Sequence, residues 1–422
     1  MRALGGSKVS MRLGVLAGAA LWATASGAMA GGFQINEQST VFLGSASSGV
    51  AAGGSIGSMY WNPAAAGQFS GLNTESSYTL VLPHADVTVT DGTTTGPTVF
   101  PPFFYVGDPN SGDIGIEALT SSTFGAYQLS KDLWVGMALN SPFGLSTKPE
   151  DTAYLGSYLG VTAKVLTINA NPMLAYRIAP GITVGAGVQI EWGRGKLQYR
   201  VPIAGIGEFV GDDWAVGGTA GILIEPAAGT SIGLGYRSQM THDLQGHFRL
   251  AGSGGVPAEA TLNLPDIVTL SLRQAISPNM RLLGTVEWTN WSRFKQLELV
   301  TPNPAFNSTL TTNWSDGWYF SVGGEYDYSP YITLRGGVGY EITPEDAPEK
   351  VLTVNPDNDR VWLAIGASYK WSETTTFDVG YSHIFVKDGS FVRSPTYDPN
   401  IVLSGTFDAH ADLISVGMRT RW

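Results

Sequence analysis

The ten residues at the C-terminal end, Leu413 to Trp422 (LISVGMRTRW), alternate between two kinds of side chain. One set is mostly apolar and the other mostly small or charged: Ile414, Val416, Met418, Thr420 and Trp422 alternate with Leu413, Ser415, Gly417, Arg419 and Arg421. Because successive side chains of a strand point to opposite faces, this order predicts a β-strand with one apolar and one polar face. The same period of two recurs in residues 182–192, 332–341 and 361–371.

The alternating pattern predicts fourteen strands. They cover residues 72–90, 117–130, 132–143, 160–178, 182–200, 213–225, 230–250, 259–275, 280–299, 312–328, 331–343, 358–371, 375–388 and 408–422. Short turns alternate with mostly longer loops at residues 91–116, 144–159, 201–212, 300–311, 344–357 and 389–407. A soluble β-sandwich would also alternate, but an even strand number with short turns at one end and long loops at the other is typical of outer-membrane barrels. The sequence therefore predicts an all-β, transmembrane antiparallel barrel over residues 71–422 in the bacterial outer membrane.

The first thirty residues have the pattern of a secretory signal peptide. Arg2, Lys8 and Arg12 precede an apolar run from Leu13 to about Ala25, and Ala28, Met29 and Ala30 form an A-x-A cleavage site before Gly31. The alternative, a membrane anchor, is disfavoured because the apolar run is shorter than the roughly 20 residues that a spanning helix needs.

Charge and cysteine content exclude several classes of protein. Loss of the signal peptide would remove three of the 24 Lys and Arg residues and none of the 35 Asp and Glu residues, leaving a net charge of −14. Such a charge argues against nucleic acid as a partner. The chain has no cysteine, which excludes disulfides and thiolate metal sites.

Residues 31–70 lack sustained alternation, yet they contain many apolar side chains and only one carboxylate, Glu37. A disordered tail would be more polar. The segment includes MYWNPAAAG, from Met59 to Gly67, in which Pro63 forbids an ordinary strand or helix interior. We expect a compact plug in the barrel lumen, with Asn62 and Pro63 in a turn that directs the chain into the first strand and pins the plug to it. The alternative is a flexible periplasmic extension.

Several motifs resemble the FadL family of outer-membrane transporters of long-chain fatty acids and aromatic hydrocarbons. They are GFQINEQ from Gly32, WNPA from Trp61, SPFGL from Ser141, LNLPD from Leu262, WSRF from Trp291 and PDNDRVW from Pro356. The resemblance spans essentially the whole mature chain. It implies a fourteen-stranded barrel closed by an N-terminal hatch, with apolar substrate held near the hatch. Release would follow either by rearrangement of the hatch or through a lateral gap near a kinked third strand.

The resemblance also implies roles for individual residues. Asn62, Pro63 and Ala64 would be the hatch signature. The residues expected to contact ligand are Phe33, Ile35, Phe42, Phe143 and Gly144, of which Phe143 and Gly144 would lie beside the opening in the third strand. The family's fatty acid transporters build part of an outer capture groove from a long loop, whereas residues 201–212 are short here. Residues 99–105 (VFPPFFY) could supply another apolar landing surface or form the buried start of the second strand.

No catalytic or metal-binding pattern stands out. His242 and His247 are the nearest histidine pair, but side chains five residues apart on a strand point to opposite faces. We therefore expect no metal, no cofactor and no enzymatic activity. Arg237, Arg273 and Arg335 lie on predicted inner faces, where they could meet a ligand carboxylate or form salt bridges across the lumen.

Passive uptake of hydrophobic compounds suits a barrel that carries a plug. The alternatives are a general diffusion porin, whose polar inner face would line open water, and an adhesive or structural barrel. The plug disfavours the porin, and the modest loop lengths disfavour the adhesin. The expected partners are a hydrophobic small molecule and the surrounding lipid and lipopolysaccharide, with the protein a monomer.

Overall fold

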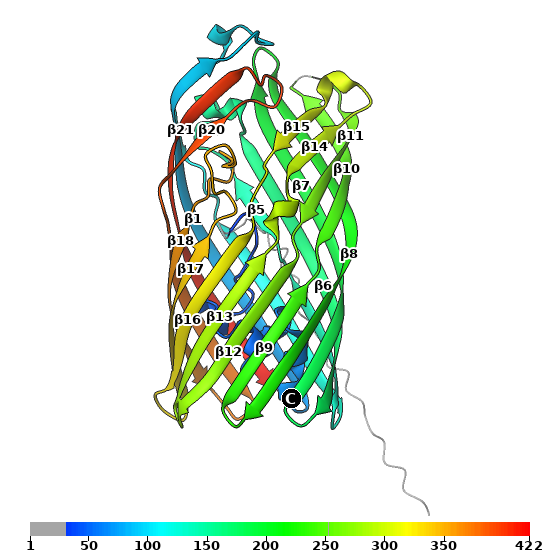
Figure 1. Cartoon of the computed structure of the whole chain (residues 1–422), viewed down its shortest axis with the longest axis vertical. Coiled ribbons are helices and arrows are strands. Elements are labelled where there is room, and N and C mark those ends of the chain that lie inside the picture. The colour runs from blue at the N-terminus through cyan, green and yellow to red at the C-terminus, as the bar shows by residue number, and fades with distance from the viewer. Residues whose placement is uncertain (1–30, 252) are drawn as a thin grey trace, which may run out of the picture.

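The computed structural model describes residues 31–251 and 253–422, and the predicted signal peptide lies outside them. The chain forms one closed barrel with tight turns and the C-terminus at one end and longer connections at the other (Figure 1). All ladders between neighbouring strands are antiparallel. The ring closes between the first strand and the last, from Asn73 opposite Arg421 to Thr94 opposite Ile401.

Fourteen strands of the described chain form the wall, and six of them are interrupted or extended by a second segment. They are β1 (Leu72–Thr94), β3 (Ala118–Ser130), β4 (Leu133–Asn140) with β5 (Gly144–Thr147), β6 (Thr162–Ala179), β7 (Ile182–Val201), β8 (Gly205–Ala227), β9 (Thr230–Arg237) with β10 (Met240–Leu250), β11 (Val256–Leu264) with β12 (Ile267–Ser277), β13 (Met280–Thr289) with β14 (Gln296–Val300), β15 (Ser308–Thr311) with β16 (Gly317–Asp327), β17 (Ile332–Ile342), β18 (Arg360–Lys370), β19 (Thr375–Val386) with β20 (Gly389–Arg393), and β21 (Ile401–Arg421). The predicted fourteen-stranded antiparallel barrel is confirmed. The remaining strand, β2 (Asn110–Asp113), pairs with the outer part of β1.

The wall has the two faces that the alternation predicts. On β21, Ile414, Val416 and Met418 are about half exposed, whereas Leu413 and Ser415 between them are buried. An exposed belt of apolar side chains is what a lipid-facing barrel surface requires. Within the part of the chain that the structure describes, no helix is both long and apolar enough to cross a membrane.

The prediction of a loop at residues 201–212 was wrong. β8 begins at Gly205, and Gly205 to Asp212 continue the ladder with β7, so the connection is only a tight turn. Ile203 and Gly205 both have positive φ in this turn. The glycines and acidic residues of this stretch resemble a loop locally, but pairing with β7 satisfies the backbone and decides the conformation.

The apolar stretch at residues 99–105 also lies outside the wall. Pro102–Phe104 forms a short 3-10 helix in the connection before β3, and Val99 and Phe103 are largely exposed. Of the two alternatives, the structure therefore shows an exposed loop position and not a strand.

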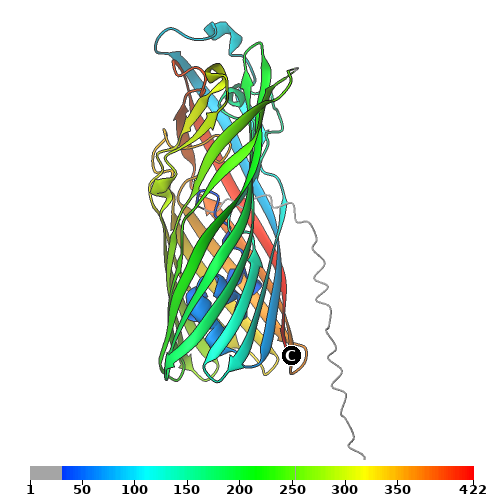
Figure 2. The same ribbon diagram turned by 90° about the vertical axis from the view of Figure 1, so that its right-hand side faces the viewer.

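Residues 31–70 lie inside the barrel, and we call them the hatch segment. The segment contains α1 (Thr40–Leu43) and three 3-10 helices, η1 (Val50–Ala52), η2 (Ile56–Tyr60) and η3 (Pro63–Gln68), and nearly all of it is buried. Figure 2 shows these turns in blue within the half of the barrel nearer the tight turns. Wall glycines allow the close packing, since a Cβ added to Gly235 would lie 1.8 Å from the Trp61 carbonyl oxygen.

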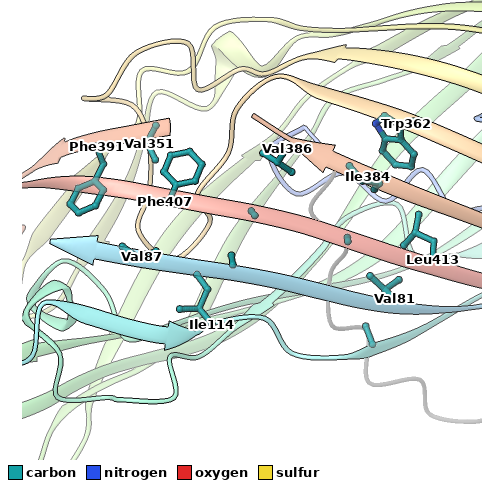
Figure 3. Close-up of a cluster of buried hydrophobic side chains, with 14 of the residues drawn as sticks. Val81, Val87, Ile114, Val351, Trp362, Ile384, Val386, Phe391, Phe407 and Leu413 are labelled. Carbon is teal, nitrogen blue, oxygen red and sulfur yellow. The ribbon is translucent and has the colours of Figure 1, made fainter. Parts of the chain in front are cut away.

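A second group of buried side chains fills the lumen beside the closing strands (Figure 3). Val81 of β1, Leu413 and Phe407 of β21, and Phe391 of β20 belong to this apolar cluster, and Val351 reaches it from the connection after β17. The lumen of this barrel is therefore packed and partly apolar, unlike the water-filled interior of a porin.

Candidate functional site: the broken third strand and the hatch

The third strand of the wall is interrupted between β4 and β5. Pairing between β3 and β4 stops at Thr123 opposite Leu139, and the outer part of β3 pairs only with β1. β5 pairs only with β6 among the described strands. Pro142 lies at the interruption and has no N–H to donate to a ladder. The wall therefore has a break in its hydrogen bonding at the place predicted from Phe143 and Gly144.

The hatch segment lines this break from inside. Gly144 N donates to the Phe33 carbonyl oxygen at 2.9 Å, and Ile35 N donates to the Pro142 carbonyl oxygen at 2.8 Å. Gln38 Nε2 donates to the Ser141 carbonyl oxygen at 2.8 Å. The start of the hatch thus satisfies backbone groups that strand pairing leaves free at the interruption.

Phe33 is the centre of an aromatic cluster. Its ring centroid lies 4.7 Å from Trp291, 5.6 Å from Phe294, 5.9 Å from Trp314 and 6.2 Å from Phe143. All five side chains are buried, and we call them the aromatic cage. The cage brings together the hatch, the break in the third strand, and two further interruptions of the wall, between β13 and β14 and between β15 and β16. A site with apolar and aromatic walls is suited to hydrophobic ligands.

The structure brings four of the five predicted ligand residues together. Phe33 and Phe143 belong to the cage, and Ile35 lies against Gly144, where an added Cβ would approach Ile35 Cδ1 to 2.7 Å. Phe42 lies elsewhere, in a separate cluster where its ring centroid is 5.6 Å from that of Trp61.

Sequence reasoning missed Trp291, Phe294 and Trp314 as parts of this site. The WSRF motif contained the first two, but a strand was expected at residues 280–299. In the structure residues 291–293 form the short 3-10 helix η6 (Trp291–Arg293), which turns Trp291 into the lumen. Nothing near Trp314 in the sequence distinguished it from other aromatic residues.

Asn62 of the hatch motif joins the hatch to the wall. Its side-chain oxygen accepts from Ala64 N at 3.0 Å and caps η3, which begins at Pro63. Its Nδ2 donates to the Ala51 carbonyl oxygen at 2.8 Å and to the Ile222 carbonyl oxygen of β8 at 3.0 Å. The side chain therefore ties the hatch to β8, whereas the sequence interpretation attached it to the first strand.

Asn62→Ala is expected to loosen the hatch. The substitution removes the cap and leaves two carbonyl oxygens without this donor, at a cost of about 1–3 kcal/mol. Hydrogen–deuterium exchange of residues 63–68 should therefore become at least tenfold faster, while the barrel strands keep their protection. Asn279→Ala, in an exposed turn, is the matched control, and equal exchange in both variants would contradict the anchoring role.

The three predicted arginines already have protein partners. Arg237 donates to the Tyr60 carbonyl oxygen at 3.0 Å and lies over the Tyr60 ring at 4.2 Å from its centroid. Arg273 and Arg335 both bind Glu325, at 3.0 Å and 2.9 Å. Arg237 therefore supports the hatch. Arg273 and Arg335 form salt bridges in the lumen, which was the predicted alternative to binding a ligand carboxylate.

The beginning of the hatch lies among buried acidic groups. Gly31 N donates to Glu341 Oε1 at 2.6 Å, and Gly32 N donates to Asp357 Oδ2 at 3.1 Å. Burial raises the pKa of Glu345, in the connection after β17, well above its usual range, and the charge of Asp357 raises it further. Cleavage at the predicted site would make the Gly31 nitrogen an ammonium group beside Glu341.

The weak histidine pair is separated. His242 is buried with Nε2 3.1 Å from Glu191 Oε1, whereas His247 is exposed, so the two side chains point to opposite faces as expected.

Comparison with known families adds to this geometry. The model of the family described as outer membrane protein transport protein (OMPP1/FadL/TodX) matches residues 21–422. The chain belongs to the FadL family. It is an outer-membrane protein of a family that transports long-chain fatty acids and aromatic hydrocarbons. The resemblance drawn from the sequence motifs is confirmed.

Individual FadL-family relatives cover most of the chain. The "Long-chain fatty acid transport protein" of Escherichia coli O6:H1 is 25% identical over 85% of this chain and 87% of its own. A Pseudomonas aeruginosa FadL homologue of known structure has a TM-score of 0.81 at 20% identity, covering 92% of this chain and 99% of its own. The Ralstonia pickettii toluene transporter TbuX has a TM-score of 0.64 at 18% identity, covering 91% and 98%. These two structures support the barrel fold.

Proposed function

We propose that this protein takes up long-chain fatty acids passively through its barrel, and that the aromatic cage is the site where the apolar chain is held. The observation that carries the proposal is the position of Phe33. This hatch residue is packed among four aromatic side chains of the wall and at the same time hydrogen-bonds across the broken third strand. A ligand that displaces Phe33 would therefore loosen the hatch at the break.

The hatch in this proposal is residues 31–70, and residues 71–422 are the barrel. Phe33, Ile35, Phe143 and Gly144 line the ligand path, Asn62, Pro63 and Ala64 hold the hatch, and Phe42 contributes to hatch packing. The protein acts as a monomer within lipid and lipopolysaccharide and carries out no chemical reaction on its ligand. The choice of fatty acids is supported by the E. coli relative.

Aromatic hydrocarbons are the second candidate substrate class. The cage favours them because its rings meet edge to face, an arrangement that an added aromatic ring can join. The toluene transporter among the similar folds points the same way.

Quenching by a brominated fatty acid tests the site. Bromine quenches nearby indole fluorescence, and Trp291 and Trp314 both lie in the cage. We expect saturable quenching in the purified mature protein, and loss of the saturable component in the Trp291→Phe/Trp314→Phe double variant. Phe33→Ala should raise the affinity for the brominated fatty acid at least fivefold. The substitution removes about 3 kcal/mol of aromatic packing that the ligand otherwise has to displace.

Phe377→Ala is the control, because Phe377 is exposed on the outer face of β19. Oleate and toluene are then added as competitors. Competition by oleate alone supports fatty acids, and competition by toluene alone favours the second candidate. Quenching that is unchanged in the double tryptophan variant would place the ligand outside the cage.

A further inference from the structure

A group of histidine and aspartate side chains lies on the outside of the barrel, away from the cage. Three of the five histidines of the chain, His84, His383 and His410, belong to it. They come from β1, β19 and β21, and β21 pairs with both of the others where the barrel closes. This clustering is not explained by the hatch or by the ligand path.

The group begins where the apolar belt ends. Along the outward faces of β1 and β21, the exposed pair Leu80 and Ile414 is followed by Leu82 opposite Asp412 and then by His84 opposite His410. Tyr381 donates to Asp412 at 2.6 Å, as an aromatic residue at the edge of a belt can. The histidines therefore lie at the edge of the lipid-facing belt, where the exposed Phe385 is opposite His410, on the side of the longer connections.

Like groups face each other across the closing ladder. His84 is opposite His410 with ring centroids 4.9 Å apart, and Asp86 is opposite Asp408. Carboxylates directly opposite each other on antiparallel strands repel, unless a cation lies between them. The arrangement is thus costly by itself and becomes favourable when a cation binds.

Three of these side chains lie close to one another. One ligand atom each from His84, Asp86 and Asp408 lies within 4.8 Å of the others, and His84 Nε2 is 3.2 Å from Asp86 Oδ2. Two ligands of a tetrahedral Zn²⁺ site lie about 3.3 Å apart, because each metal–ligand bond is about 2.0–2.1 Å long. The first pair already has this separation.

Asp113 of β2 orients the imidazole. Its Oδ2 lies 2.9 Å from His84 Nδ1, and its Oδ1 accepts from Ala85 N at 3.1 Å and Gly115 N at 2.8 Å. With the Nδ1 proton held by this carboxylate, the Nε2 lone pair faces Asp86, whose Oδ2 lies 3.2 Å away. A carboxylate on the far nitrogen of a metal-bound histidine is a common arrangement that strengthens binding.

We infer that His84 Nε2, Asp86 and Asp408 bind a divalent transition-metal cation such as Zn²⁺, with Asp113 as the positioning residue. An imidazole with two carboxylates suits zinc better than calcium or magnesium, which prefer oxygen ligands. Because Asp113 ends β2, and Gly115 bridges to Thr147 at the end of β5, a cation bound to His84 would also fix the end of β2 beside β1 and β5. The site does not depend on which compound the barrel transports.

Equilibrium dialysis against Zn²⁺ tests this site in the detergent-solubilised mature protein. We expect one Zn²⁺ per chain, and at least tenfold weaker binding in His84→Gln and in Asp86→Asn/Asp408→Asn. His247→Gln is the matched control, since His247 is exposed on β10 away from this group. The difference in electrophoretic mobility between unheated and heated samples verifies that each variant is folded.

Co²⁺ supplies a readout of geometry. Asp113→Asn should weaken Zn²⁺ binding about tenfold and should also change the visible absorption of the Co²⁺ form, which a purely structural effect on β2 would not do. Absence of Zn²⁺ binding in the wild type, or an equal loss in His247→Gln, overturns the inference. The inference is also overturned if His84→Gln lowers the thermal stability while the stability of the wild type is the same with Zn²⁺ and with a chelator. His84 would then act as an imidazolium that bridges Asp86 and Asp113.

Discussion

Deletion of residues 31–60 is expected to turn an electrically silent barrel into a conducting one. In planar bilayers, the single-channel conductance should be about tenfold or more above that of the intact protein, since an unplugged barrel of this size has a polar passage. The deleted segment is almost entirely buried in the lumen, where it packs on β9, β12, β16, β17, β18 and β19. Its loss removes the side chains and backbone that exclude water there.

A matched deletion separates this effect from general damage. Residues 99–104 lie in the exposed connection before β3, so their removal should leave the protein silent. Steady conductance in the intact protein would contradict occlusion by the hatch. Silence after deletion of residues 31–60 would instead show that the buried connection around Val351 and Val354 closes the lumen without the hatch.

Glu325→Gln is expected to produce the largest loss of stability among single substitutions in the wall. Glu325 on β16 binds Arg273 at 3.0 Å, Arg281 at 2.8 Å and Arg335 at 2.9 Å, so one carboxylate joins four strands. Its side chain is only 9% exposed. Removing one partner of such a buried pair costs about 3–5 kcal/mol. Here Arg273 loses its ion pair and Arg335 keeps Asp378 at 4.0 Å, whereas Arg281 keeps Asp327.

Denaturant unfolding in detergent, followed by far-ultraviolet circular dichroism, measures this loss. The control is Glu373→Gln, which removes a carboxylate that pairs with Lys370 in an exposed turn and should change stability very little. Glu325→Gln combined with Arg273→Gln should recover part of the loss, since Arg281 keeps Asp327 and Arg335 keeps Asp378 as carboxylate partners. Equal midpoints for Glu325→Gln and Glu373→Gln would show that the network contributes no stability.

The two expectations concern different parts of the lumen. The hatch fills space and can leave without breaking a wall ladder, because most of its hydrogen bonds to the wall go to side chains, such as those of Glu75, Ser77 and Thr285. The Glu325 network joins wall strands to one another and is independent of ligand. The two roles are separate if the deletion of residues 31–60 makes the barrel conduct without lowering its stability. Glu325→Gln should in turn lower the stability without making the barrel conduct.

The sequence by itself determined the class of fold and the number of strands. Alternation is a local property, because each strand must show one face to lipid and one to the lumen, and the turn and loop lengths follow from the antiparallel order. Residues 413–422 therefore predicted β21 without any knowledge of its partners. The predicted ranges failed mainly where pairing overrides local composition, as at Gly205, and where a strand is interrupted, as at Trp291.

Only the tertiary structure decided what the hatch touches. Phe33 meets Trp291 and Trp314 across more than 250 residues of chain, Asn62 reaches Ile222 of β8, and His84 faces His410 because the barrel closes between its first and last strands. Period and composition describe each segment alone. Contacts between segments depend on the order and register of the closed sheet, which brings distant residues together.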